Sequence, residues 1–372
     1  MVDKKKGAKV EILTIHFGIN HGSVLQCYAL SQTLRDLGAQ VEVIDYVPSR
    51  YRMWNNVKIK YPGKSFPWKI AFYAASSLIR FPQKLVFRSY LKRHIDLSRR
   101  YSDAAELQTD PPAADLYIVG SDQVWNSTYN GSEDKSYLLG FAPDGSMRAS
   151  YAASIGKDEL EEREGLEIAE GVAGFAGVSV RERKAASLLS RFGVDARVDL
   201  DPVFLFDARR WGELASPRRE DRPYVLVYVI AQGYEEMVCQ AREIADMRGA
   251  RLYVLSVRPI RLPGVDRNFL FANPSDFLAL FRDADFVVSN SFHGTAFSII
   301  FRKKFLTYAA RYNSRIENIL FCTGLDGRLV TGEYDEASVF KEIDYSHAAR
   351  VIEKGASESC SYLRGLLEEA AR

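Results

Sequence analysis

The fold class of this chain is decided by residues 10–46, VEILTIHFGINHGSVLQCYALSQTLRDLGAQVEVIDY. The β-branched and apolar run at 10–17 predicts a buried strand. Residues 23–37 place apolar side chains largely on one side of a helix, which Gly38 ends. Another apolar run, at 41–46, predicts a second strand. The order strand, helix, strand predicts a βαβ unit with a right-handed crossover, the building block of a parallel α/β sheet.

The same alternation continues along the chain and restarts after the polar stretch SPRREDR at 216–222. We therefore expect an α/β protein with one domain at 1–215, a second at 223–345 and helices at 346–372. Strands are predicted at 115–120, 149–154, 177–180, 198–200, 224–230, 251–257, 285–289 and 305–309, and helices at 183–192, 235–247, 274–282, from 294, and at 315–322.

Composition excludes several functional classes. The 372 residues carry a net charge of +2, so no overall charge imbalance indicates a nucleic-acid partner. The four cysteines lie far apart and form no CxxC or Cys/His cluster, which predicts neither a metal site nor a disulfide framework. No apolar run approaches the ~20 residues that span a bilayer, and the N-terminus lacks a signal-peptide core. We expect a cytoplasmic protein, with peripheral contact at the inner face of the membrane as an open alternative.

One segment, residues 50–100, departs from the average composition. It holds 13 Lys and Arg against one acid, Asp96, and so carries +12, while the rest of the chain carries −10. Ten aromatic residues are interleaved with these bases. One interpretation is a helical insertion whose aromatic residues pack on the core and whose bases are solvated. The other is a docking surface for anionic lipid headgroups or a polyanionic acceptor; nucleic acid is disfavoured because no recognised binding motif accompanies the charge.

Polar residues follow the first and third predicted strands, where open α/β sheets bind ligands. The glycine-rich stretch at 18–22, which contains Asn20, suits either a binding loop or a structural turn and is not a GxGxxG motif. His21 within it is more typical of a surface histidine than of a catalyst. After the strand at 115–120 come residues that suit hydroxyl recognition, with an N-cap and a buried Trp as the alternative: Ser121, Asp122, Gln123 and Trp125.

Two further strand ends carry cationic groups. Arg181, in VSVRER at 178–183, can clamp a carboxylate or phosphate, or can pair with Glu182 or another acid. The stretch VVSNSFHGTAF at 287–297 puts His293 at a helix start, where an anion and a general acid can share one pocket; a capping histidine is the alternative. Its neighbours are Ser291, Phe292, Gly294 and Thr295, and Arg315 adds a guanidinium at the same sheet edge.

Six stretches in this order resemble the polysaccharide pyruvyl transferase family. They are ILTIHFGINHGSVLQCYAL, IVGSDQVWN, SYAASIGK, VSVRE, DLDPVFLF and VSNSFHGTAFSIIF, and the resemblance covers residues 11–329. It implies two Rossmann-like domains in a GT-B-like arrangement with the site in the interdomain cleft. It also implies transfer of pyruvate from phosphoenolpyruvate to two hydroxyls of a sugar, in a cell-surface polysaccharide or its lipid-linked precursor, forming a ketal without metal or cofactor.

The resemblance also assigns roles to residues of this chain. His293 corresponds to the family's histidine before glycine and is the expected catalytic acid, and Arg181 is an expected donor clamp. Donor contacts are also expected from the start of the following helix and from Arg315, and acceptor contacts from Asn20 and the residues at 121–125. Better-characterised members carry Arg two positions before this histidine, whereas this chain has Ser291. The missing anion contact is worth about 1.5–3 kcal/mol, and Arg311, Arg315 or a base of the insertion could replace it.

Two rival hypotheses stay open at the level of sequence. A GT-B-type glycosyltransferase that uses a nucleotide sugar would have the same fold, and fold does not determine function. A protein without enzymatic activity could instead bind glycan, or act as a scaffold, while docked on a membrane through residues 50–100.

Overall fold

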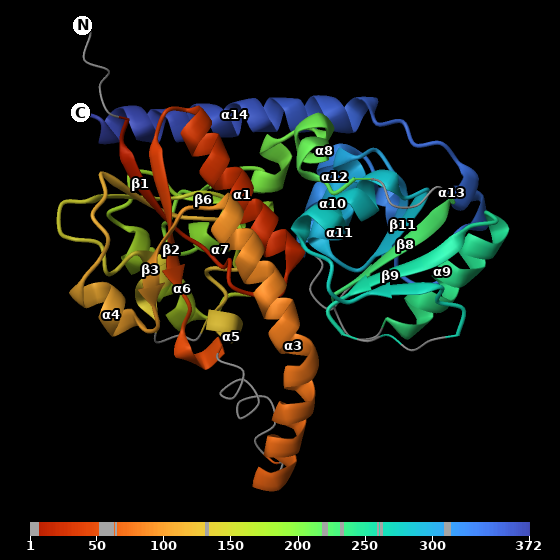
Figure 1. The fold of residues 1–372 in the computed structure, drawn as a ribbon. Helices are drawn as coiled ribbons and strands as arrows, with labels where there is room; N and C mark the ends of the chain where they lie inside the picture. The colour runs from red at the N-terminus through yellow and green to blue at the C-terminus, as the bar shows by residue number, and fades with distance from the viewer. Residues whose placement is uncertain are drawn as a thin grey trace, which may run out of the picture.

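Two parallel sheets form the framework of the protein (Figure 1). The computed structural model describes residues 7–51, 63, 65–130, 134–217, 222–230, 234–258, 260, 263–308 and 314–372. The first sheet has five strands in the order β3-β2-β1-β4-β5, and the second has six in the order β10-β9-β8-β11-β12-β13. Every strand pair in both sheets is parallel, which confirms the predicted α/β class with two Rossmann-like sheets.

The first sheet contains the predicted βαβ unit. The unit consists of β1 (Lys9–Leu13), α1 (His21–Asp36) and β2 (Gln40–Tyr46). The other strands of this sheet are β3 (Leu97–Tyr101), β4 (Leu116–Val119) and β5 (Met147–Ser150). Helix α1 is buried on two sides, because Val24 and Leu30 pack on the first sheet while Leu25 and Ala29 pack in the core of the second domain. The start of α1 therefore lies at the junction between the domains.

The second sheet is covered by helices on both faces. All six residues of β8 (Tyr224–Val229) are buried, as expected for a central parallel strand. The other elements are α9 (Glu235–Met247), β9 (Arg251–Ser256), β10 (Arg267–Phe269), α10 (Pro274–Asp283), β11 (Phe286–Ser289), α11 (Phe292–Ile300), β12 (Lys304–Tyr308), α12 (Ser314–Thr323) and β13 (Leu329–Val330). The remaining helices are α3 (Phe66–His94), α4 (Ala104–Thr109), α5 (Ser127–Asn130), α6 (Glu162–Val172), α7 (Arg183–Ser190), α8 (Ala208–Leu214), α13 (Glu336–Phe340) and α14 (Ser346–Ala370).

Some predicted elements differ from the structure. The first strand ends at Leu13 because the next residues bond through side chains: the Thr14 hydroxyl donates to the Ser121 carbonyl, 2.6 Å away. The strands predicted at 177–180 and 198–200 are a separate two-stranded sheet, β6 (Ser179–Val180) and β7 (Arg197–Val198). The segment 50–100 is not helical throughout, since its end is β3, which pairs with β2. Part of this segment, including Trp54, lies outside the described residues.

The C-terminal segment is one long helix rather than several. Helix α14 runs across both domains (Figure 1). Ala348 near its start packs in the core of the second domain, and Leu363, Leu366 and Leu367 near its end pack in the core of the first. This helix holds the two domains together at the side away from α3.

His21 is a buried interdomain contact, so the expectation of a surface histidine is wrong. Its Nε2 lies 2.9 Å from the carbonyl oxygen of Ala272 in the second domain. Its ring stacks on Phe277 at 5.0 Å between centroids and contacts Phe87 of α3. Burial lowers the pKa of His21 from 6.5 to about 4, so the ring is neutral at pH 7 and Nε2–H donates to that carbonyl.

This pKa predicts an acid-sensitive interdomain contact. Because the folded-state pKa lies below the unfolded one, the unfolded chain binds more protons between pH 6.5 and 4, and stability falls as the pH falls through that window. At about 1.4 kcal/mol per pKa unit, the contribution is about 3 kcal/mol. Urea unfolding at several pH values should show wild type losing about 2–3 kcal/mol more than His21→Asn between pH 7 and pH 4.5. Equal losses in the two proteins would refute the assignment.

Candidate active site

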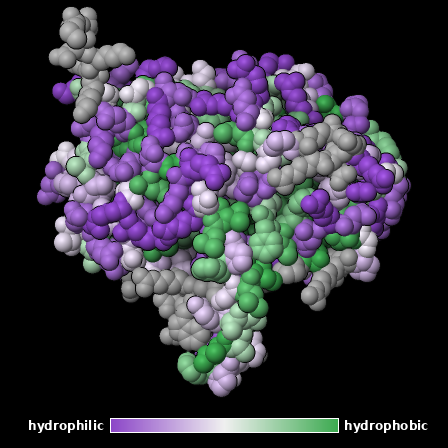
Figure 2. All heavy atoms as spheres, in the orientation of Figure 1, coloured by the Kyte–Doolittle hydropathy of each residue, from purple (hydrophilic) through white to green (hydrophobic). Residues whose placement is uncertain are grey.

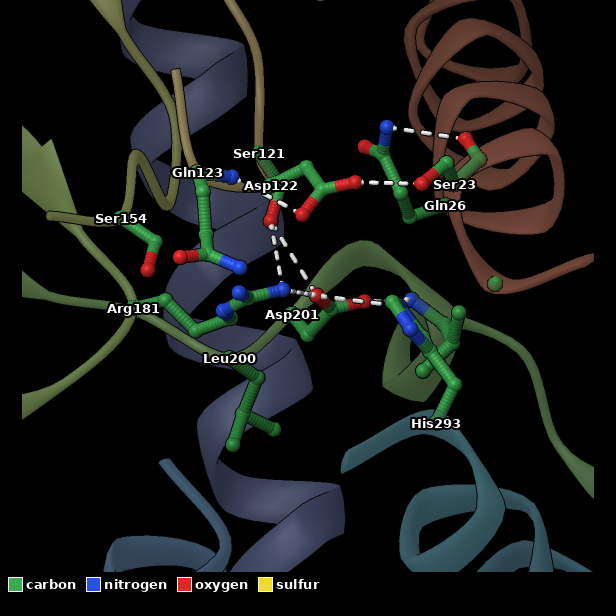
Figure 3. A network of polar contacts seen from close by, with 12 residues as sticks. Ser23, Gln26, Ser121, Asp122, Gln123, Ser154, Arg181, Leu200, Asp201 and His293 are labelled. Carbon is green, nitrogen blue, oxygen red and sulfur yellow. Dashed lines mark hydrogen bonds and ion pairs between the residues drawn. The ribbon is translucent and has the colours of Figure 1, made fainter. Parts of the chain in front are cut away.

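Residues from the carboxyl ends of both sheets meet at the domain junction (Figure 3). Asp122 follows β4, Arg181 follows β6, and Asp201 follows β7 in the first domain. His293 begins α11, directly after β11 of the second domain. Ser23, in the first turn of α1, faces Asp122. The arrangement confirms that the two Rossmann-like domains meet through their strand ends, as in a GT-B-like arrangement.

A buried ion pair between Arg181 and Asp201 is the centre of this cluster. The Arg181 Nη1 donates to Asp201 Oδ2 and, at 3.5 Å, to the Ser121 hydroxyl. The other Asp201 oxygen accepts the backbone N–H of Val203 at 3.0 Å. Burial alone would lower the pKa of Arg181, but the carboxylates of Asp201 and Glu182 raise it above its ordinary value. The guanidinium is therefore a permanent cation held in place at one nitrogen.

Two of the three guanidinium nitrogens of Arg181 have no hydrogen-bond partner. Nε and Nη2 are buried and unpaired, although Nε lies 3.8 Å from Glu182 Oε2. The planar group lies over the Phe292 ring at 4.6 Å, which fixes its orientation. Buried donors without acceptors are costly in a protein interior, so an anionic ligand that accepts from Nε and Nη2 would be strongly favoured here.

His293 joins the same ion pair from the second domain. Its Nε2 lies 3.7 Å from Asp201 Oδ2 and has no hydrogen-bond partner. The ring packs against Gly22, where an added Cβ would stand 2.0 Å from Nδ1, so only glycine fits at that position of α1. Burial lowers the pKa of His293, the charge of Asp201 opposes this effect, and Arg181 adds to it. The imidazole is therefore poised so that a bound anion favours its protonated form.

Asp122 is a charged carboxylate at a strained backbone position. Its φ of 77° lies in the left-handed region that non-glycine residues seldom adopt. The side chain accepts hydrogen bonds from the Ser23 hydroxyl and from the backbone N–H of Gln123. Burial would raise the pKa of Asp122, but the charge of Arg181 and the hydrogen bond from Ser23 help to lower the pKa below its usual value. This carboxylate can accept a hydrogen bond or a proton from a hydroxyl group.

Glu182 supplies a second carboxylate beside Arg181. Its Oε1 accepts from the Ser154 hydroxyl at 2.9 Å and from the backbone N–H of Gly156 at 3.3 Å. Its Oε2 is buried without a hydrogen-bond partner. The ion-pair alternative for Arg181 is thus present in the structure, with Asp201 as the closer partner and Glu182 as the more distant one.

Arg315, at the start of α12, lies close enough to Arg181 for their charges to interact. Burial and the Arg181 charge lower the pKa of Arg315, whereas Glu182 and Asp122 oppose this effect. Within the described residues, the Arg315 guanidinium forms no hydrogen bond or ion pair. Two cations of opposing domains repel each other unless an anion binds near both. Of the arginines predicted to compensate for Ser291, Arg315 lies in the described part of the chain, and Arg311 lies outside it.

The first turn of α11 forms the floor beside His293. By helix geometry, the N–H groups of Phe292, His293 and Gly294 have no acceptor within the helix. The Ser291 side chain makes no cap hydrogen bond to them. A Cβ at Gly294 would stand 2.0 Å from the Ser289 hydroxyl, so this glycine allows close packing of helix and strand. An anion near His293 would meet these donors as well as the arginines.

Three side chains that are predicted to contact a ligand form hydrogen bonds inside the fold. The Asn20 side chain caps α1 by accepting from Gly22 N and Ser23 N. Trp125 is buried in the core of the first domain, and its indole N–H donates to the Tyr137 carbonyl at 2.9 Å. The Thr295 hydroxyl bonds to Ser291 O and Thr307 Oγ1. These bonds match the structural alternatives for Asn20 and Trp125, and ligand contact by the three side chains stays a prediction.

Gln123 stays at the edge of the cluster. Its amide oxygen accepts from Asn126 Nδ2 at 2.8 Å, and its side chain extends toward Arg181 in Figure 3. Four members of the cluster were not among the predicted site residues. They are the acids Asp201 and Glu182 and the hydroxyls of Ser23 and Ser154. Asp201 offered one signal, because an Asp directly after a short predicted strand lies at the binding edge of an α/β sheet.

An open cavity of about 530 Å³ lies between the domains beside Arg315. Its lining comes from both domains: Asp158 and Lys184 from the first, and Ser314, Glu317, Asn318 and Phe321 from the second. The cavity lies between the domains, and its lining includes none of Asp122, Arg181, Asp201 and His293. Among the described residues, no group of three or more His, Cys, Asp and Glu side chains could hold a metal ion.

One protein family and several solved structures are similar to this chain. The family model described as polysaccharide pyruvyl transferase matches residues 20–310. A comparison with curated protein sequences finds no match. Among solved structures, UDP-N-acetylglucosamine 2-epimerase from Rickettsia bellii is 10% identical and covers 98% of this chain and 94% of that chain, with a TM-score of 0.49.

Two other solved structures are similar to the same degree. UDP-GlcNAc 2-epimerase from Methanocaldococcus jannaschii is 12% identical, with 93% and 92% coverage and a TM-score of 0.47. A spinosyn forosaminyltransferase is 13% identical, with 98% and 95% coverage and a TM-score of 0.43. At these values the likeness says nothing of substrate or activity, and the fold class follows from the two parallel sheets themselves.

Proposed function

The chain belongs to the polysaccharide pyruvyl transferase family, and from this premise we propose that it transfers pyruvate from phosphoenolpyruvate to two hydroxyls of one sugar. The acceptor is a cell-surface polysaccharide or its lipid-linked precursor, and the product is a cyclic ketal. One observation carries the donor assignment. The unpartnered Nε and Nη2 of Arg181 and the unpartnered Nε2 of His293 are buried at the domain junction, and the half-buried Arg315 lies close enough for its charge to act on both residues.

Phosphoenolpyruvate suits this cluster because it carries two anionic groups, a carboxylate and a phosphate. The planar fork of Arg181 matches the bidentate geometry of either group. Arg315 and the first turn of α11 supply further positive potential for the other group. In this proposal, Arg181 and Arg315 together supply the anion contacts that an arginine at position 291 would make, where this chain has Ser291.

His293 is the proposed general acid. The charge of the bound donor raises the pKa of the imidazole, which burial lowers in the free protein, and Asp201 stabilises the resulting cation from 3.7 Å. Nε2–H then delivers its proton to C3 of the enol phosphate, which leaves an electron-deficient centre at C2. The carboxylates of Asp122 and Glu182 lie in the same cluster and stabilise this positive charge electrostatically.

The acceptor hydroxyls complete the reaction. One hydroxyl oxygen bonds to C2 and loses its proton to the carboxylate of Asp122, which already accepts a hydrogen bond from the Ser23 hydroxyl and which passes the proton to the departing phosphate. The C2–O bond to phosphate then breaks, and the second hydroxyl oxygen bonds to C2 and loses its proton. The methyl group keeps the proton from His293, one hydroxyl proton leaves on hydrogen phosphate, and the other restores His293. The ketal and inorganic phosphate therefore balance the two substrates.

Release of phosphate tests this proposal. Purified protein, phosphoenolpyruvate and a panel of sugar and lipid-linked acceptors should release inorganic phosphate only when an acceptor with two suitably spaced hydroxyls is present. Phosphoenolpyruvate should also raise the melting temperature, since a ligand that binds only the folded state stabilises it. Stabilisation by a nucleoside diphosphate but not by phosphoenolpyruvate would favour a glycosyltransferase instead. Binding of glycan without turnover of either donor would favour the scaffold hypothesis.

A further inference from the structure

Helix α3 projects from the body of the protein while its C-terminal part is firmly anchored (Figure 1). Phe87, Tyr90 and Leu91 near its C-terminus are buried in the core of the first domain. The Gln83 amide donates to the carbonyls of Val257 and Leu270 of the second domain, at 3.1 and 2.7 Å. Contacts to both domains therefore hold the C-terminal part of α3 from Gln83 onward, and the N-terminal part projects from the body.

The projecting part carries an exposed apolar stripe. Leu78, Phe81 and Leu85 are 78%, 63% and 53% exposed, and Ile70 is 47% exposed. The spacings of three, four and eight residues place these side chains on one side of the helix, roughly opposite Phe87 and Tyr90. Figure 2 shows apolar side chains gathered along this projection. An apolar stripe of this extent on a surface helix indicates a contact surface.

The charge of α3 indicates which partner covers the stripe. The helix contains six Lys and Arg residues and no Asp or Glu. Arg88 and Lys92 are exposed and continue the stripe at helical spacing, toward the end where the helix joins the body. Along the stripe itself, the apolar side chains therefore lie toward the projecting end of the helix, and Arg88 and Lys92 lie closer to the folded domains. This order matches a bilayer surface, with apolar side chains at the acyl boundary and bases among anionic headgroups.

We propose that this face of α3, formed by Ile70, Leu78, Phe81, Leu85, Arg88 and Lys92, docks the protein on an anionic lipid bilayer. No helix in the described part of the chain is long and apolar enough to cross a membrane, so the contact is interfacial. A second copy of the chain is a poorer partner, because pairing two α3 helices would bring like charges together without any acid on either helix. An anionic leaflet provides the complementary charge.

Co-sedimentation with vesicles tests this surface. Wild-type protein should bind vesicles of phosphatidylcholine mixed with phosphatidylglycerol, should bind far less to pure phosphatidylcholine, and should dissociate as salt increases. Leu78→Glu and Phe81→Glu should each lower the partition coefficient about tenfold or more, because each removes a buried apolar contact with the acyl boundary. Arg88→Glu with Lys92→Glu should abolish the preference for anionic vesicles.

Matched controls lie elsewhere on the surface. Leu166→Glu and Phe340→Glu change side chains that are 49% and 53% exposed on α6 and α13, and both variants should bind vesicles like wild type. Arg163→Glu and Arg209→Glu are the corresponding charge controls on α6 and α8. Because all these side chains are exposed, each variant should keep the wild-type melting temperature.

Three results would overturn the proposal. They are wild-type protein that remains in the supernatant with anionic vesicles at low salt, equal loss of binding in the control variants, and α3-dependent dimers in sedimentation velocity without vesicle binding. The proposal stands apart from the catalytic one. Stabilisation by phosphoenolpyruvate should be unchanged in Leu78→Glu, because Leu78 is 78% exposed on the projecting part of α3 and is not a member of the cluster around Arg181 and His293.

Discussion

His293→Gln is expected to lower the rate of phosphate release by about 10²–10⁴-fold, the usual range for loss of a general acid. Glutamine can donate a hydrogen bond from a nitrogen near the place of Nε2, but it cannot deliver a proton to C3. The affinity for phosphoenolpyruvate, measured by calorimetry, should change much less, because the arginines carry most of the anion contact. The rate effect should therefore appear in kcat rather than in KM.

The pH dependence provides an independent check on His293. In the free protein, burial lowers the pKa of this imidazole, so donor binding should be accompanied by proton uptake near neutral pH. Calorimetric titrations in buffers of different ionisation enthalpy measure that uptake, which should disappear in His293→Gln. Undiminished turnover in this variant would show that another group supplies the proton. Wild-type binding without proton uptake would show that the imidazole does not titrate with the donor.

Arg181→Met is expected to cost about 3–5 kcal/mol of folding stability, the typical effect of removing one partner from a buried ion pair. The variant leaves the carboxylate of Asp201 buried, with only the hydroxyl of Ser121 and the N–H of Val203 as donors. Chemical denaturation at pH 7 measures this loss. Phosphoenolpyruvate should also fail to raise the melting temperature, because the two unpaired guanidinium nitrogens are gone.

A second variant separates the structural role of Arg181 from its role in donor binding. Asp201→Asn in the Arg181→Met background removes the uncompensated charge and should recover most of the lost stability. It should not restore donor binding, since no bidentate cation is present. Recovery of donor binding in the double variant would reduce Arg181 to a structural ion-pair partner and would move the donor site elsewhere.

Local sequence patterns were sufficient to predict most of the framework. Apolar runs and helical spacing repeat within a few residues, and they predicted the central strands of both sheets. Strand ends lie at one edge of a parallel sheet whatever their neighbours are, so Asp122, Arg181 and His293 could be selected before their contacts were known. The edge strand β3 was not predicted because its sequence, LSRRY, is polar, and its pairing with β2 depends on the sheet already present.

Side-chain roles were harder to predict than positions. Trp125 and Thr295 have the right chemistry for ligand contacts and lie next to the site in sequence, yet each bonds inside the fold. Asn20 is likewise used as a helix cap. A side chain's partner depends on its direction and on what packs around it, which spacing along the chain does not specify.

The sequence by itself determined two parallel α/β sheets, the strand ends that carry polar groups, and a basic segment set apart from an acidic remainder, because these depend on local order and composition. The tertiary structure alone decided that Arg181 is held by Asp201, that His293 reaches both from the other domain, and that Arg315 lies close enough for its charge to act on Arg181 and His293. The tertiary structure also decided that α3 projects from the two domains and that its apolar stripe is exposed. The physical reason is that burial and charge pairing depend on which surfaces meet, and Asp201 and His293, which come together here, lie more than 90 positions apart in the chain.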